Sequence, residues 1–132
     1  MNDFCRICVT VMALSLAVAT TARAEDTVIA TGAFQGKNGH MASGGVSLVK
    51  TADGMAVVLG ADFKFDGAPD PKLGFGKGGY FKSTQFSPLK SNKGRQRYAI
   101  PARIKAGGYP EIWIWCQKYA VPLGLARLKP AK

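Results

Sequence analysis

Hydrophobic and polar residues alternate over short stretches of this chain, and no stretch sustains a helical period. Most stretches end at glycine, proline, asparagine or aspartate, which favour turns. Segments 46–50 and 55–59 are joined by Ala52-Asp53-Gly54, whose Asp-Gly pair favours a β-hairpin. Such a pattern predicts an all-β fold, a small sandwich or barrel of short, mainly antiparallel strands. The predicted strands are 27–34, 46–50, 55–59, 63–66, 80–81, 84–86, 97–101, 111–119 and 121–128.

One glycine-rich segment, residues 74–79, fits the G-x-G-x-x-G pattern of a dinucleotide-binding site. That site requires a strand before the glycines and a helix after them. Here prolines precede the segment, and Tyr80-Phe81 follows it without a helical pattern. We therefore interpret residues 74–79 as a flexible loop.

Segment 111–119 contains both tryptophans and Cys116. Side chains alternate between the two faces of a strand, so Ile112 and Ile114 share the face of Cys116 and the tryptophans take the other. Both faces are apolar, which predicts a central strand covered on both sides. The thiol is then at least partly buried, and the tryptophans are expected in the core rather than in an exposed stacking surface. Lys118 falls on the face of Cys116 by the same alternation, where a cation would activate the thiol.

The first 24 residues have the features of a secretory signal peptide. Arg6 supplies a positive charge, residues 8–19 are apolar but too few for a comfortable membrane span, and Ala22-Arg23-Ala24 matches a cleavage signal. No later stretch is long and apolar enough to cross a bilayer, so no transmembrane span is expected after cleavage. We expect a mature protein of a single β domain, residues 25–132, exported to the periplasm or the cell exterior.

Cleavage would change the cysteine content of the protein. Cys5 and Cys8 lie in the predicted signal, and Val9 rather than histidine follows their C-x-x-C spacing, which excludes attachment of a c-type haem. The mature chain would keep Cys116 alone, without an internal disulfide partner, in a compartment that favours disulfides. This thiol is therefore expected to be shielded, linked to another chain, or used in chemistry.

The charge of the chain points to anionic partners. It has 18 basic and 8 acidic residues and a net charge of +10. Such a surface attracts polyanions, and export argues against nucleic acid, so acidic envelope glycans and anionic lipid head groups are the expected partners. A merely solvated basic surface is the alternative. The lysines are spread along the chain, apart from a cluster at 90–97 that reads as a turn.

The remaining candidate ligands are few. His40 is the only histidine, and it could supply a second ligand or accept a proton from Cys116, or simply be a solvated loop residue. One histidine and one retained cysteine are too few for a structural zinc site or a blue-copper site, so no metal site is expected. A haem with Cys116 as axial ligand stays open, and the cofactor is otherwise unknown. Asp62, Asp66 and Asp70 lie beside turn residues and are interpreted as turn-forming.

Several short motifs occur in order along the chain. They are Phe34 with His40 and Gly44-Gly45, FKFDGAPDP at 63–71, LKS at 89–91, GRQRYAIP at 94–101 and IWCQKYAVPLGLARL at 114–128. In these motifs the chain from about residue 34 to 128 resembles the electron-transfer domain family DM13. The resemblance implies a small extracytoplasmic β domain whose hallmark is the cysteine matching Cys116, and a redox role with a protein partner.

Two functions therefore remain open at the level of the sequence. The first is an exported redox or electron-transfer protein that works through Cys116 as a redox thiol or a thiolate ligand. The second is a non-enzymatic envelope binding or structural module, whose basic surface binds anionic glycans, lipids or a protein and whose cysteine only fills the core. Whether the protein is an enzyme is not decided by these residues.

Overall fold

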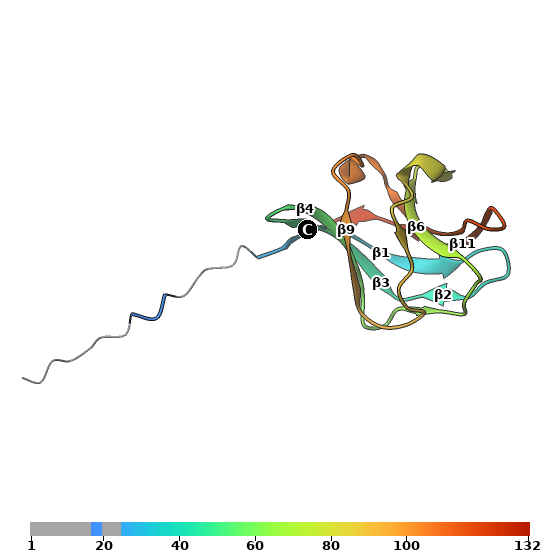
Figure 1. Ribbon diagram of the computed structural model, residues 1–132, viewed down its shortest axis with the longest axis horizontal. Helices are drawn as coiled ribbons and strands as arrows, with labels where there is room; N and C mark the ends of the chain where they lie inside the picture. The colour runs from blue at the N-terminus through green and yellow to red at the C-terminus, as the bar shows by residue number, and fades with distance from the viewer. Residues whose placement is uncertain (1–16, 20–24) are drawn as a thin grey trace, which may run out of the picture.

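The computed structural model describes residues 17–19 and 25–132 (Figure 1). The predicted cleavage site and the two cysteines of the signal, Cys5 and Cys8, lie outside the described residues. Within the described ranges, no helix has the length and apolar character needed to cross a membrane.

The described chain consists of short strands and two single-turn 3-10 helices, which confirms the all-β prediction. The strands are β1 (Thr27–Gly36), β2 (Ala42–Ser43), β3 (Gly45–Thr51), β4 (Gly54–Leu59), β5 (Lys64–Phe65), β6 (Pro71–Gly76), β7 (Tyr80–Phe81), β8 (Ser87–Pro88), β9 (Gln96–Ile100), β10 (Glu111–Cys116), β11 (Val121–Arg127) and β12 (Lys129–Pro130); the 3-10 helices are η1 (Lys82–Thr84) and η2 (Ala106–Gly108).

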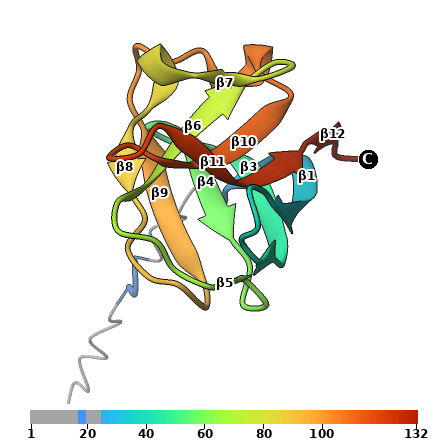
Figure 2. The same cartoon turned by 90° about the vertical axis from the view of Figure 1, so that its right-hand side faces the viewer.

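One large antiparallel sheet, in the order β7-β6-β10-β11-β1-β3-β4-β9, forms most of the molecule. β12 extends it beside β1 and β8 beside β6, while β2 and β5 pair separately. The sheet curls into a half-barrel, as the views in Figures 1 and 2 show. The predicted hairpin is present between β3 and β4, and β10 is a central strand between β6 and β11, as predicted.

Alternate residues of the curled sheet bury their side chains in one apolar core. Val57 and Leu59 of β4 and Ile112 and Ile114 of β10 are fully buried in it. This two-residue period is the signal that made the strands predictable. A smaller cluster of Val49, Ala56 and Val58 packs separately from this core.

The interpretation of residues 74–79 as a loop is wrong for its first half, because β6 runs through Gly76. Leu73 and Phe75 are fully buried, so Gly74 and Gly76 face the opposite side of the strand. An added Cβ at Gly74 would come within 2.5 Å of the Tyr80 ring. At Gly76 it would meet the backbone carbonyl oxygen of Gly79 first and the Trp113 indole nitrogen at 2.5 Å. Gly74 therefore makes room for an aromatic ring, and Gly76 for both the backbone of the following turn and a ring.

Two further boundaries differ from the prediction. Residues 84–86 are not a strand: η1 ends at Thr84, whose buried hydroxyl accepts the N–H of Phe75 (2.8 Å) and donates to the carbonyl oxygen of Phe81 (2.6 Å). β10 ends at Cys116, and residues 117–120 form an exposed turn rather than more strand.

Candidate functional site

Cys116 is the last residue of β10 and lies opposite Pro71 of β6 and Val121 of β11. Its side chain is 1% exposed and belongs to the same core cluster as Ile112 and Ile114. The predicted sidedness of this strand is confirmed.

A single turn follows Cys116 in the chain. Residues 117–120 are exposed, and the N–H of Gln117 donates to the carbonyl oxygen of Asp70 at 3.1 Å. Pro71, which follows Asp70, has no N–H and so cannot donate a second backbone hydrogen bond at this place. Ala120 closes the turn with φ of 52°, a left-handed conformation that costs a residue with a Cβ about 1 kcal/mol. The strand that carries the buried thiol thus ends in an exposed turn with one strained residue.

Lys118 does not share the face of Cys116, because the alternation ends with the strand. Lys118 lies in the exposed turn, and its ammonium nitrogen is 5.4 Å from the ring centroid of Tyr119. The expectation that this cation flanks the thiol is wrong.

His40 instead pairs with Asp66. Its Nδ1 lies 3.0 Å from Asp66 Oδ1, and Asp66 Oδ2 accepts the N–H of Met41 at 3.0 Å. The Met41 hydrogen bond, together with the bond and charge of His40, holds the pKa of Asp66 below its ordinary value of 3.8. With Asp66 ionised, its carboxylate accepts a hydrogen bond from the Nδ1–H of His40.

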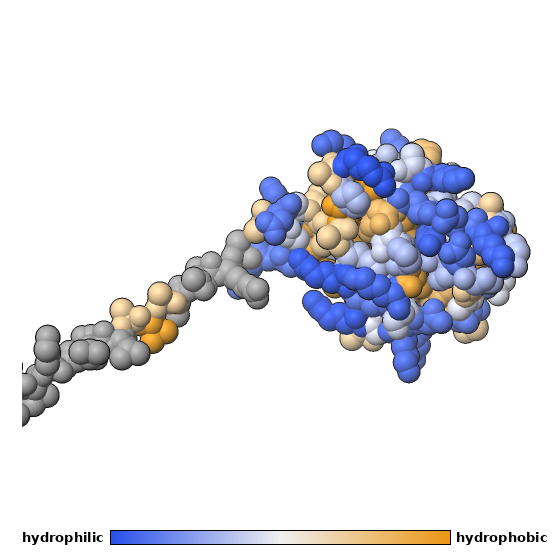
Figure 3. Space-filling model, viewed as in Figure 1, coloured by the Kyte–Doolittle hydropathy of each residue, from blue (hydrophilic) through white to orange (hydrophobic). Residues whose placement is uncertain are grey.

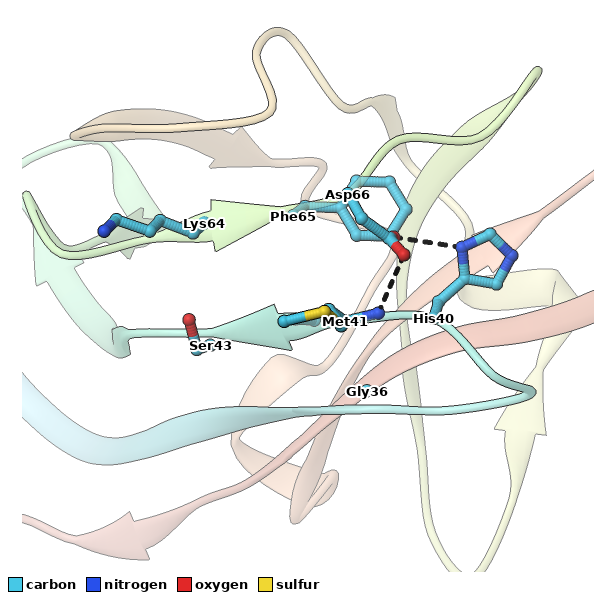
Figure 4. Close-up of a pocket in the computed structure, with 8 residues that line it drawn as sticks. Gly36, His40, Met41, Ser43, Lys64, Phe65 and Asp66 are labelled. Carbon is cyan, nitrogen blue, oxygen red and sulfur yellow. Dashed lines mark hydrogen bonds and ion pairs between the residues drawn. The ribbon is translucent and has the colours of Figure 1, made fainter.

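This pair lies at one end of a hollow of about 470 Å³ on the outer side of β2 and β5 (Figure 4). Ser43 and Lys64 lie toward the other end. The side chain of His40 is 28% exposed here and is hydrogen-bonded to Asp66, whereas Cys116 lies in the core.

Cys116 is separate from the described cavities. Further cavities of about 410, 380 and 450 Å³ open on the described surface, and Cys116 lines none of the four. A haem ligated by this thiol would require the surrounding core to open, so the donor set does not fit haem in this conformation.

The two tryptophans lie half-buried on the outer face of β10 rather than in the core. Trp115 stacks on Tyr80, with ring centroids 4.5 Å apart and an interplanar angle of 12°. Burial raises the pKa of Tyr80 to about 12, and its hydroxyl donates to the Gln85 side chain at 2.9 Å.

A buried carboxylate supports the other tryptophan. Glu111 accepts the indole N–H of Trp113 at 2.8 Å and, through its second oxygen, the N–H of Gly78 at 2.8 Å. Sequence reasoning missed Glu111 and Tyr80 as partners of the tryptophans. The available signal was the pair of glycines in β6, which leave space for rings.

Comparison with known proteins supplies a family. No curated protein matches the chain, and no solved structure does. A family model described as electron transfer DM13 matches residues 33–128, a span that holds both His40 and Cys116. Because this match covers most of the chain, the protein belongs to the DM13 electron-transfer family.

Proposed function

We infer that this protein is an exported electron-transfer module in which Cys116 is the redox-active group. The observation that carries the proposal is the electron-transfer family match, whose span includes this residue. Cys116 is also the one free thiol among residues 25–132. A thiol is a side chain that protein partners can oxidise and reduce reversibly.

The chemistry that fits a lone thiol is exchange with a disulfide of a partner protein. The thiolate of Cys116 attacks one partner sulfur, the partner S–S bond breaks, and the other partner sulfur leaves as a thiolate. A thiolate of a second molecule then attacks the partner sulfur of the mixed disulfide and releases Cys116 as a thiolate. The second thiol must come from outside the domain, because residues 25–132 hold no other cysteine.

Burial makes this exchange depend on an opening of the structure. With 1% of its side chain exposed, Cys116 cannot be approached in line by a second sulfur. The turn at residues 117–120 is the nearest segment that can open locally, since it is exposed and anchored at Gln117. Closure protects the thiol from irreversible oxidation between encounters.

Export is supported by the signal-like features of residues 1–24. The periplasm or the cell exterior supplies the disulfides that the proposed exchange consumes. The expected partner is accordingly a redox protein with an accessible disulfide.

A second candidate function, anion binding, is favoured by a specific observation. Residues 25–132 contain three ion pairs, and most of the many cations stay outside them. Hydrophilic side chains cover much of the face in Figure 3. In this case the partner is an anionic envelope glycan, a lipid head group or a protein surface, and the cysteine fills the core.

The thiol proposal is tested with the mature protein in glutathione buffers of graded oxidation. Intact mass spectrometry of the native protein should show one reversible glutathione adduct, which the Cys116→Ala variant lacks. An adduct that forms only after unfolding would overturn the proposal. A folded Cys116→Ala variant, verified by circular dichroism, is the required control.

A further inference from the structure

We propose that the outer face of β2, β5 and residues 92–94 is a binding site for an acidic glycan, with Lys64 and Lys93 as its cationic contacts. The inference deepens the second candidate function, anion binding, and is independent of Cys116. It gives that function a location and a class of ligand.

The two lysines face each other across neighbouring antiparallel segments. Lys64 of β5 forms a β-bridge with Lys93. Backbone hydrogen bonds of 2.8 and 3.0 Å flank the pair on either side instead of joining it. In such a non-hydrogen-bonded pair the Cα atoms lie about 4.5 Å apart and the side chains are at their closest.

Among residues 25–132, neither of these two lysines forms an ion pair. The ion pairs of residues 25–132 join His40 to Asp66, Asp70 to Lys72 and Asp26 to Arg97. Neither Lys64 nor Lys93 takes part, and both are exposed. Like charges directly opposite each other destabilise a sheet, so a bound anion would remove a repulsion as well as gain two attractions.

The hollow that Lys64 lines offers contacts for more than a charge. Ser43 of β2 pairs with Lys64 of β5, on the side of β5 away from Lys93. Met41 is 75% exposed along the same face. The nearby carboxylate of Asp66 directs its oxygens to His40 and to the N–H of Met41, while Figure 4 shows Lys64 extending away from it.

These contacts match a sugar carrying carboxylate or sulfate groups. Lysine ammonium groups pair with the anion, the Ser43 hydroxyl bonds to a ring hydroxyl, and the Met41 thioether packs on a C–H face. A membrane surface fits less well, because interfacial binding needs protruding apolar anchors and the site is a hollow with Met41 as its one large exposed apolar side chain.

The test compares two double variants that remove the same charge. Lys64→Gln with Lys93→Gln removes the proposed contacts, and Lys50→Gln with Lys105→Gln removes two exposed lysines elsewhere. Titration with oligogalacturonate and with heparin oligosaccharides at 50 mM salt should show binding at least about fivefold weaker in the first variant and nearly unchanged in the second. Equal weakening in both would overturn the site while leaving anion binding intact.

Three further outcomes decide the proposal. Wild-type protein that binds neither oligosaccharide refutes both the site and the anion-binding function. Binding to phosphatidylglycerol vesicles in place of the oligosaccharides refutes the glycan as ligand. Lys64→Gln should leave the melting temperature in low salt unchanged or raise it, since it removes a repulsion. A lower melting temperature together with lost binding would point to structural damage and contradict the proposal.

Discussion

Replacing Gly74 by alanine should destabilise the protein, although it adds only one methyl group. Gly74 lies in β6 beneath Tyr80, and the new Cβ would come within 2.5 Å of the Tyr80 ring carbon Cε2 and 2.9 Å of its hydroxyl. The ring must therefore shift off the strand. Its stack on Trp115 and its hydrogen bond to Gln85 shift with it.

The size of the effect follows from the contacts that would be lost. The aromatic pair contributes about 1 kcal/mol, and the Tyr80–Gln85 hydrogen bond about 1 kcal/mol. Partial exposure of a half-buried ring costs about 1 kcal/mol more. Alanine favours a strand over glycine by up to about 1 kcal/mol, so we expect a net loss near 2 kcal/mol in the free energy of unfolding.

Urea unfolding followed by tryptophan fluorescence measures this loss. Gly107→Ala is the matched control, because a Cβ there meets no atom within 4 Å, and it should change stability by less than about 0.5 kcal/mol. In a Tyr80→Ala background the cost of Gly74→Ala should disappear. If Gly74→Ala and Gly107→Ala behave alike, the explanation of the glycine-rich strand is refuted.

Three further predictions concern titration and the cover of the thiol. The pKa of Tyr80 is raised from 10 to about 12, so its contribution to stability is complete below pH 10 and disappears as the pH rises toward 12. Tyr80→Phe should therefore lose less free energy of unfolding than wild type over this pH range, as measured by urea titration. The pKa of Asp66 is lowered, so its ionised form stabilises the fold above pH 3.8; the difference in urea midpoint between wild type and Asp66→Asn should shrink as the pH falls below that value. Ala120→Gly relieves the left-handed strain, and we expect the free energy of opening the turn to rise by up to about 1 kcal/mol. Maleimide should then label Cys116 up to about fivefold more slowly.

The strands were predictable where side chains alternate between core and solvent. β9 shows that alternation in its sequence. β4 and β10 are apolar runs whose β-forming residues and flanking turn residues identify them as strands, and the Asp-Gly turn marks the hairpin between β3 and β4. β6 was missed because its glycines resemble a loop. The space that side chains would need is taken by the Tyr80 ring at Gly74 and by the Gly79 carbonyl and the Trp113 ring at Gly76, which pattern alone does not assign to that strand.

The candidate site was predictable only in part for the same reason. The face of Cys116 follows from counting along β10, and its burial follows from the isoleucines that share the face. The place where the strand ends is set by its pairing with β6 and β11, so Lys118 was assigned wrongly. The partner of His40 is 26 residues away at Asp66, a separation that local periodicity does not reach.

The electron-transfer function proposed for this protein requires that the buried thiol of Cys116 can react in the native state. The most direct measurement mixes reduced, native, mature protein with increasing concentrations of a coloured aromatic disulfide and records the released thiolate. We expect one equivalent of thiolate per chain and none from Cys116→Ala. The rate should reach a plateau set by opening of the turn. Release that occurs only in denaturant would contradict this expectation.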